Sequence, residues 1–200
     1  PLGTIAAFRA GSWIDRLVML FSVGGFSIPV FVLGYILIYY FSITWRILPV
    51  QGYRSPFEDG MLPFIQHIIL PTLTLSVIYI ALLARMTRAS VMEVLEEDYI
   101  RTARAKGLSE VKILMRHALG NAAVPIVTVI GIGIALLIGG VVVTESVYNI
   151  PGLGRLVLDA VLARDYPIIQ GLILFFSLIY VLLNLIIDLT YTLFDPRIKY

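Results

Sequence analysis

Cysteine is absent from this 200-residue sequence, and charged residues are scarce. Without cysteine there can be no disulfide framework, no thiolate metal site and no cysteine nucleophile. Only 14% of the residues are charged, whereas 59% are hydrophobic, and the mean hydropathy is +0.93. A soluble domain of this size would spread charge over most of its surface. We therefore predict an integral membrane protein.

Several signatures of chemistry are also missing. The net charge of only +2, with no basic patch interleaved with aromatic residues, argues against a nucleic-acid partner. Two histidines without an HExxH motif give little support for a metal site, and no nucleophile can be paired with a base. The chain also lacks the GxxxxGK[ST] phosphate cradle. We expect it to be non-catalytic and to bind no cofactor itself.

The amino-terminal sequence PLGTIAAFRAGS lacks an initial Met. It also lacks the basic start, apolar core and cleavage site of a signal peptide. We expect the sequence to be a fragment whose preceding element is missing.

Four stretches without charged residues are long enough to cross about 30 Å of hydrocarbon. These stretches are residues 17–44, 68–84, 122–144 and 168–187. They predict an all-α integral membrane protein, a polytopic helical bundle with one transmembrane domain over residues 1–200. Pro29 should kink the first span, and Pro71 should lie in the first turn of the second, where a missing N–H is harmless. None of the spans contains the acidic, basic or histidine residue that a proton-coupled carrier needs inside the membrane.

Lysine and arginine predict which side each loop faces, because they are enriched in cytoplasmic loops. If residues 85–121 are cytoplasmic, that side holds Arg9, Arg16, Arg85, Arg88, Arg101, Arg104, Lys106, Lys112, Arg116, Arg197 and Lys199. The other side holds only Arg46, Arg54, Arg155 and Arg164. We therefore predict that the amino-terminal end, the 85–121 loop and the carboxy-terminal tail face the cytoplasm.

The 85–121 loop contains twelve of the chain's 28 charges, seven basic and five acidic. Each would cost roughly 2.5 kcal/mol or more at mid-bilayer, so burying all twelve would cost on the order of 30 kcal/mol. The loop must therefore lie in water or against another protein.

The same loop has a helical pattern with a corner. Good helix formers run to Lys106, with Glu97 and Arg101 at the favourable i,i+4 spacing. Gly107 suits the left-handed position that ends a helix, and Ser109 can cap a second one. That second helix should present Leu108, Val111, Leu114, Met115 and Ala118 on one side. Such a helix pair is expected either for an amphipathic loop on the membrane surface or for a docking element, and the residues alone leave both open.

The segment DYIRTARAKGLSEVKILMRHALGNAAVP resembles the EAA loop of permease subunits of ATP-binding-cassette importers. The general pattern is Glu-Ala-Ala, three residues, Gly, nine residues and Ile-x-Leu-Pro. Aligned on Gly107, this chain has Arg101-Thr102-Ala103 and His117-Ala118-Leu119-Gly120, and it departs from the pattern at the Glu, the first Ala, the Ile and the Pro. It is very similar to the variant of the dipeptide, oligopeptide and nickel permease subfamily. The stretch VVVTESVYNIPGLGRLVLDAVLARDYPIIQG (141–171) and the closing FDPR (194–197) carry the same resemblance.

This resemblance implies that the loop inserts into a cleft on a cytoplasmic ATPase subunit and transmits its motion. ATP and Mg would be bound by that partner. Gly107 would set the angle between the two arms, and the apolar side chains would press into the partner while the cations meet acidic or carbonyl groups. The ATPase-docking residues are then Tyr99, Arg101, Thr102, Ala103, Arg104, Lys106, Gly107, Leu108, Val111 and Leu114.

The resemblance also implies that the family's amino-terminal span is missing from this sequence. It implies an assembly in the plasma (inner) membrane of a prokaryote, surrounded by lipid. Its other members would be a second homologous permease, two ATPase subunits and an extracytoplasmic substrate-binding protein. Peptides are the favoured cargo, with nickel complexes or other small solutes as the alternative. An ATP-independent channel or carrier and a membrane enzyme are the competing functions from other classes.

Two further sets of residues are candidates for packing and gating. Gly131, Ala135 and Gly139 form a small-residue stripe that permits close helix approach, either within the subunit or towards a second permease. The outer segment 148–167 should contain a short amphipathic helix, acting as an interfacial anchor or, by the resemblance, lying near the outer mouth. Its candidate gate residues are Pro151, Gly152, Gly154 and Asp165.

Overall fold

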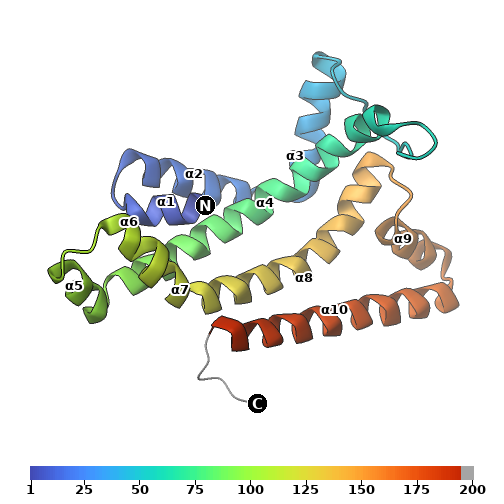
Figure 1. Cartoon of the computed structure of the whole chain (residues 1–200). Coiled ribbons are helices and arrows are strands. Elements are labelled where there is room, and N and C mark those ends of the chain that lie inside the picture. Colours follow the sequence, from blue (N-terminus) through green and yellow to red (C-terminus); the bar gives the residue numbers. More distant parts are fainter. Residues whose placement is uncertain (195–200) are drawn as a thin grey trace. The chain divides into compact units, whose positions relative to one another are not determined.

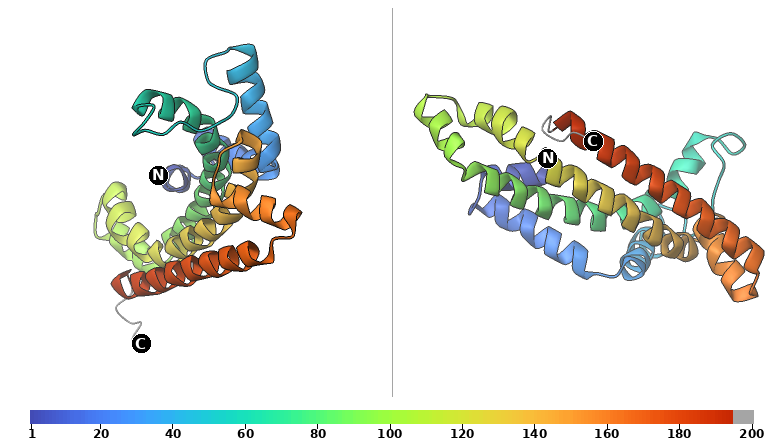
Figure 2. Two further views of the ribbon diagram at one scale, coloured as in Figure 1. Left: turned by 90° about the vertical axis from the view of Figure 1, so that its right-hand side faces the viewer. Right: turned by 90° about the horizontal axis from the view of Figure 1, so that it is seen from below.

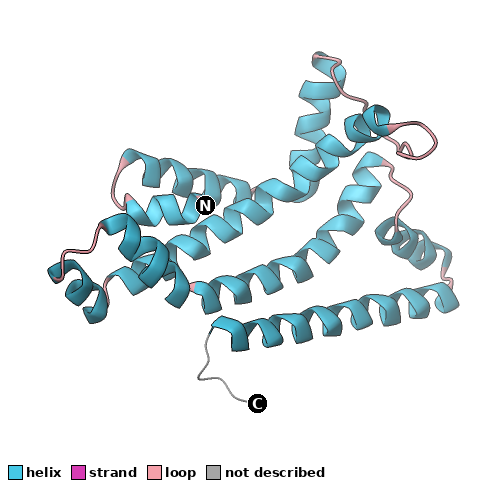
Figure 3. Cartoon of the chain, viewed as in Figure 1, coloured by secondary structure: helices cyan, strands magenta, loops and turns pink. Residues whose placement is uncertain are grey.

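A computed structural model describes the backbone of residues 1–194 and the side chains of residues 1–191. Within this part of the chain every regular element is a helix, as Figures 1 and 3 show. The elements are α1 (Leu2–Phe8), α2 (Trp13–Ser27), α3 (Val30–Leu37), the π-helix η1 (Ile38–Thr44), α4 (Met61–Leu95), α5 (Asp98–Ala105), α6 (Glu110–Lys112), the π-helix η2 (Ile113–Ala118), α7 (Leu119–Asn121), α8 (Ala123–Tyr148), α9 (Leu153–Ala163) and α10 (Tyr166–Phe194). The closing FDPR motif, apart from the backbone of Phe194, and the cations Arg197 and Lys199 lie outside the described residues.

Three of these helices, α4, α8 and α10, are long and apolar enough to cross a membrane. The pair formed by α2 and α3 passes the same test if it is counted as one broken span. The break lies at Ile28 and Pro29, with a sharp bend between the helices. Proline lacks an N–H and disfavours helical geometry in the residue before it. The predicted kink at Pro29 is therefore a complete interruption.

The helix α4 begins earlier than the sequence predicted, at Met61 rather than near residue 68. Gly60 takes a left-handed turn (φ +91°) just before it, and Pro63 then occupies its first turn. Pro71 lies inside the helix, so its placement in a first turn is wrong. The run 68–84 is therefore only part of α4, which extends back to Met61 at one end and through charged sequence to Leu95 at the other.

The chain folds into two compact units. Unit 1 consists of residues 1–24, 80–133 and 181–200, and unit 2 consists of residues 25–79 and 134–180. Unit 1 has two small apolar cores, one around Val91 and Leu114 and one around Ile100 and Ile113. Unit 2 has one core, around Leu70 and Tyr148.

Most large apolar side chains lie outside these cores. In α10, for example, Leu174 is 71% exposed and Val181 61% exposed. A contiguous apolar surface of this kind is a liability in water but is suited to lipid or to neighbouring helices. The distribution agrees with the predicted class, an all-α membrane protein.

Candidate functional site

The predicted corner at Gly107 is present in the backbone. Gly107 has φ +78°, in the left-handed region, and separates α5 from the arm formed by α6, η2 and α7, hereafter the second arm. The N–H of Gly107 donates to the carbonyl of Arg104 at 2.9 Å, and the N–H of Leu108 donates to the carbonyl of Ala103 at 3.3 Å. Nothing lies within 4 Å of the position that a Cβ on Gly107 would occupy. Glycine is therefore favoured here by backbone conformation and not by crowding.

The two arms of the corner share a small apolar core. Ile100 and Ile113 are fully buried, Ala103 is 8% exposed, and Leu95 and Leu108 pack against them. The predicted docking residues Ala103 and Leu108 therefore contribute to packing inside the corner. The right-hand view of Figure 2 shows α5 and the second arm on either side of the turn.

Polar contacts connect the same two arms. The guanidinium of Arg104 donates to both carboxylate oxygens of Glu110, at 2.8 and 3.2 Å. The Asn121 amide donates to the Tyr99 hydroxyl at 2.7 Å and to the carbonyl of His117 at 2.8 Å. Partial burial raises the pKa of Tyr99 above its ordinary value and the Glu97 carboxylate adds to the rise, whereas the hydrogen bond from Asn121 opposes it. The phenol therefore stays neutral at physiological pH and accepts the bond from Asn121.

One predicted ion pair in α5 is replaced by another. Arg101 contacts Asp98 at 3.2 Å, at i,i+3 spacing, instead of Glu97. Glu97 is the N-cap residue with extended backbone, because α4 ends at Leu95 and a new helix begins at Asp98. Both charged groups of the Arg101 pair are exposed, so the pair contributes little to stability.

The single apolar side predicted for the second arm is divided in two. Leu114 and Ala118 are buried against Ala7, whereas Val111 and Met115 are each 62% exposed. The arm changes from α6 to the π-helix η2 at Ile113. Because a π-helix bonds i to i+5 and has more residues per turn, residues three apart, such as Val111 and Leu114, no longer share a face. Residues four apart still do, since Val111 and Met115 are both exposed while Leu114 and Ala118 are both buried. Val111 and Met115 are thus the exposed apolar residues of this arm.

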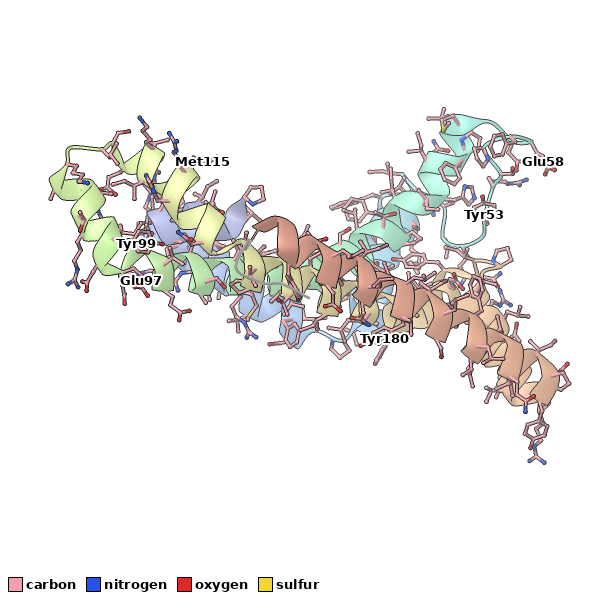
Figure 4. The ribbon with its side chains drawn as sticks, turned by 60° about the horizontal axis from the view of Figure 1, so that its bottom comes forward. Tyr53, Glu58, Glu97, Tyr99, Met115 and Tyr180 are labelled. Atoms are coloured by element: carbon pink, nitrogen blue, oxygen red, sulfur yellow. The ribbon has the colours of Figure 1, made fainter. Side chains whose placement is uncertain are left out.

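The outward surface of the corner combines these apolar side chains with charges. Figure 4 shows Tyr99 on α5, Glu97 at the start of that helix and Met115 on the second arm. Arg101, Thr102 and Lys106 are also exposed, and the Thr102 hydroxyl donates to the carbonyl of Asp98 at 3.0 Å. The corner therefore presents an amphipathic surface on a helix pair whose own core is already filled.

Asp15 and Arg88 form a contact that the sequence did not predict. The Asp15 carboxylate is buried and receives two hydrogen bonds from the Arg88 guanidinium, at 2.5 and 2.8 Å. The sequence did contain a hint of this contact, since Asp15 and Arg88 each lie close to the end of a predicted span on the predicted cytoplasmic side. It did not distinguish Arg88 from the neighbouring Arg85.

The segment 148–167 contains the predicted amphipathic helix, α9 (Leu153–Ala163). The Glu145 carboxylate accepts a hydrogen bond from the N–H of Arg155 at 2.9 Å, and it occupies the space that a Cβ on Gly152 would need. A Cβ on Gly154 would lie 2.6 Å from the Cα of Val142. The two glycines therefore allow α9 to approach the end of α8, while Pro151 is exposed.

Asp165 connects α9 to α10. Its N–H donates to the carbonyl of Ala160 at 2.9 Å, and its carboxylate accepts from the N–H of Ile168 at 3.3 Å, near the start of α10. Arg164, with φ +56°, makes the left-handed turn between the helices, which Figure 2 shows side by side.

The end of α8 is held by neutral hydrogen bonds. The Tyr148 hydroxyl lies 2.8 Å from that of Thr74 and donates to the carbonyl of Gly34 at 3.3 Å. From the loop after η1, the Gln51 amide donates to the carbonyl of Val147 at 3.1 Å, and the N–H of Gly52 donates to the carbonyl of Tyr148 at 2.8 Å. These bonds join α3, α4, α8 and the loop after η1.

The small-residue stripe of α8 has two different environments. Gly131 is buried, and the side chain of Ile187 fills the space next to it. Gly139 is exposed, with nothing within 4 Å of the position that a Cβ would take, and Ala135 is partly buried. Gly131 thus serves packing within unit 1, while Gly139 leaves a face open to another helix. Among the described residues, no three His, Asp or Glu side chains gather closely enough to bind a metal ion.

The chain matches known membrane proteins over its whole length. The model of the family described as binding-protein-dependent transport system inner membrane component matches residues 1–200. The chain is 60% identical over 198 residues to a protein of Sinorhizobium fredii named probable peptide ABC transporter permease protein y4tP, covering 99% of this chain and 63% of the relative. It is 48% identical over 198 residues to the glutathione transport system permease protein GsiC of Escherichia coli, covering 99% of this chain and 62% of the relative. It spans a little less than two thirds of the length of these relatives.

Proposed function

The chain belongs to the family of binding-protein-dependent transport system inner membrane components, and from this premise we propose that it is the permease subunit of an ATP-driven importer. Membership in this family confirms the resemblance found in the sequence. The family and the long apolar helices together make the chain a multi-pass inner-membrane protein. In the proposed importer the chain forms half of the translocation path and performs no bond chemistry.

The 85–121 loop and the carboxy-terminal end face the cytoplasm in this proposal. Its support is the separation of the basic residues between the two units. All nine described Lys and Arg residues of the predicted inner side belong to unit 1, and Arg46, Arg54, Arg155 and Arg164 belong to unit 2. Because cytoplasmic loops are rich in Lys and Arg, unit 1 contains the inner ends of the spans.

The Gly107 corner is the element that docks on a cytoplasmic ATPase subunit, which binds ATP and Mg. The observation that supports this role best is the exposed pair Val111 and Met115 on a helix pair that already has its own core. A basic amphipathic helix on lipid is rich in Lys and Arg on its polar face. Here acidic groups such as Asp98 and Glu110 share the surface with Arg101 and Lys106, which suits a protein cleft with charges of both signs.

The proposed assembly contains a second homologous permease, two ATPase subunits and an extracytoplasmic substrate-binding protein. The exposed Gly139 face is the candidate contact for the second permease, and α9 with the loop 45–60 is the candidate surface for the binding protein. Peptides are the proposed cargo, supported by relatives named for peptide and glutathione transport. Nickel complexes or other small solutes are the alternative cargo of the same machine.

A substitution at Gly107 tests the coupling role. Valine strongly disfavours a positive φ, whereas asparagine tolerates it, and a Cβ meets nothing at this position. In membrane vesicles containing the assembled importer, Gly107→Val should abolish ATP-driven uptake of radiolabelled alanyl-alanine and glutathione, and Gly107→Asn should retain most of it. Normal ATP-driven uptake in the valine variant would contradict the proposed corner, and uptake that needs no ATP would favour an ATP-independent carrier.

A further inference from the structure

A buried ion pair joins the start of α2 to α4. The Arg88 Nε donates to Asp15 Oδ1 at 2.5 Å, and Arg88 Nη2 donates to Asp15 Oδ2 at 2.8 Å. The second carboxylate oxygen also accepts the N–H of Gly11 at 2.9 Å. The Asp15 side chain is only 5% exposed, and that of Arg88 is 23% exposed. This two-point geometry fixes the orientation of the turn between α1 and α2 as well as its distance from α4.

The short helix α1 is held against the same part of α4. A Cβ on Gly3 would collide with the carbonyl oxygen of Ala84 and would lie 2.7 Å from the Cβ of Thr87. Gly3 therefore lets the two helix backbones approach closely. Figure 1 shows α1 alongside α4, towards the end that leads into α5.

The second arm of the corner packs on this junction. Ala7 of α1 and Val91 of α4 share one buried cluster with Leu114 and Ala118 of the second arm and with Ala122, which follows it. Ala118, Ala122 and Val91 are completely buried, so the cluster has no solvent layer along which the elements could slide. Contacts therefore run without interruption from the corner through α4 to the start of α2.

We propose that Asp15 and Arg88 are positioning residues that clamp the α1–α2 turn to α4, so that α1, this end of α4 and the second arm move as one body. The proposal rests on the proposed function, in which an ATPase displaces the corner. The charges resist separation because the Asp15 carboxylate would be left buried without its partner. Displacement of the corner would then move two helices that lead into the membrane, α2 and α4, and not α4 alone.

The first test measures coupling in the importer reconstituted with its ATPases, its second permease and its binding protein. Arg88→Gln should lower the amount of labelled glutathione or alanyl-alanine imported per ATP hydrolysed at least tenfold, while the ATPase rate stays within about twofold of wild type. Arg88→Lys retains the charge but not the two-point contact and should give an intermediate ratio. The control Arg16→Gln makes the same change at an exposed neighbouring position and should give the wild-type ratio.

If the ion pair had a purely structural role, its loss would lower the rate of uptake and the rate of ATP hydrolysis together. If uptake and ATP hydrolysis fall in parallel in Arg88→Gln, with an unchanged ratio per assembled complex, the proposal is overturned. It is equally overturned if neither rate changes. These outcomes differ from failure of the proposed function, which would appear as ATP-independent uptake in the wild-type complex or as normal uptake in Gly107→Val.

The second test observes the rigid body directly in a complex with the native ion pair. The chain has no cysteine, so spin labels can be attached specifically at Arg9→Cys, after α1, and at Gly120→Cys, at the end of the second arm. Both positions are exposed, and a Cβ on Gly120 meets nothing within 4 Å. The distance between the labels should be the same without nucleotide and with ATP and vanadate trapped. A shift of that distance between the two states would refute the clamp.

Discussion

The polar contacts inside unit 1 differ in chemistry from those inside unit 2. In unit 1 the central polar contact is ionic, between Asp15 and Arg88, and apolar clusters lie on the elements beside it. In unit 2 it is neutral, between Tyr148, Thr74 and the Gly34 carbonyl, and loop amides bind the free carbonyls at the end of α8. Hydrogen bonds between charged groups are stronger than neutral ones, and the two-point contact of Arg with a carboxylate also sets the orientation of the two side chains.

This difference matches the roles proposed for the two units. In the proposed importer, the Gly107 corner of unit 1 transmits force from the ATPase. In the same proposal, α9 and the loop 45–60 of unit 2 are the candidate surface for the binding protein. We therefore expect loss of the ionic contact in unit 1 to be more damaging than loss of the neutral contact in unit 2.

The largest effect should follow from removing the cation of the buried pair. Arg88→Ala leaves the Asp15 carboxylate buried without a counter-ion, and breaking a buried pair in this way costs about 3–5 kcal/mol. Thermal unfolding in detergent should show a large loss of stability. Arg16→Ala, at the exposed position next to Asp15, should change stability by about 0.5 kcal/mol or less. Equal effects in the two variants would show that the pair is not what holds unit 1 together.

The next effect tests close packing in unit 2. In Gly154→Ala the new methyl group meets the backbone of Val142 at 2.6 Å, and overpacking of this kind costs about 1–3 kcal/mol. Gly139→Ala is the matched control on α8, because nothing lies within 4 Å of its Cβ, and it should stabilise the helix by about 0.5–1 kcal/mol. Thermal unfolding of both variants distinguishes crowding from helix propensity. A stable Gly154→Ala variant would mean that α9 does not press against α8.

A smaller loss is expected from the neutral cluster. Tyr148→Phe removes a buried hydroxyl, but Thr74 keeps its bond to the carbonyl of Leu70 at 2.8 Å. The cost should therefore be about 1 kcal/mol, close to the usual net value of one hydrogen bond. A loss as large as that of Arg88→Ala, measured in the same unfolding experiment, would remove the proposed distinction between the units.

The smallest effect should come from an exposed ion pair in unit 1. Asp98 and Arg101 are 3.2 Å apart, but their side chains are 94% and 72% exposed. Asp98→Asn should change thermal stability by no more than about 0.5 kcal/mol. A substantial loss would show that position within unit 1, and not burial, decides how much a charge matters.

The sequence predicted the features that depend on local backbone chemistry. Gly107 was expected in the left-handed region and lies there, and the break at Pro29 follows from the missing N–H. The membrane class followed from long uncharged runs, because lipid accepts no unpaired charge at its centre. The amphipathic helix α9 was also visible from its pattern.

Features that depend on register and tertiary partners were not predictable in this way. Leu114 matched the apolar spacing of Val111 but lies buried, because η2 departs from α-helical periodicity. Arg88 was one of several cations on the same predicted side, and only the fold shows that it reaches Asp15. The docking residues also depend on a partner surface that this chain does not contain, so they stay predictions.

The most direct test of the account is cross-linking of the corner to the ATPase subunit in the assembled importer. Single cysteines would be placed at Met115, on the exposed second arm, and at Phe57, which is 97% exposed in a loop of unit 2. With a short thiol-to-amine reagent during ATP turnover, the Met115 position should form a covalent product with the ATPase and the Phe57 position should form none. Absence of a product at Met115 in an actively transporting complex would contradict the proposal that force enters this chain through the Gly107 corner.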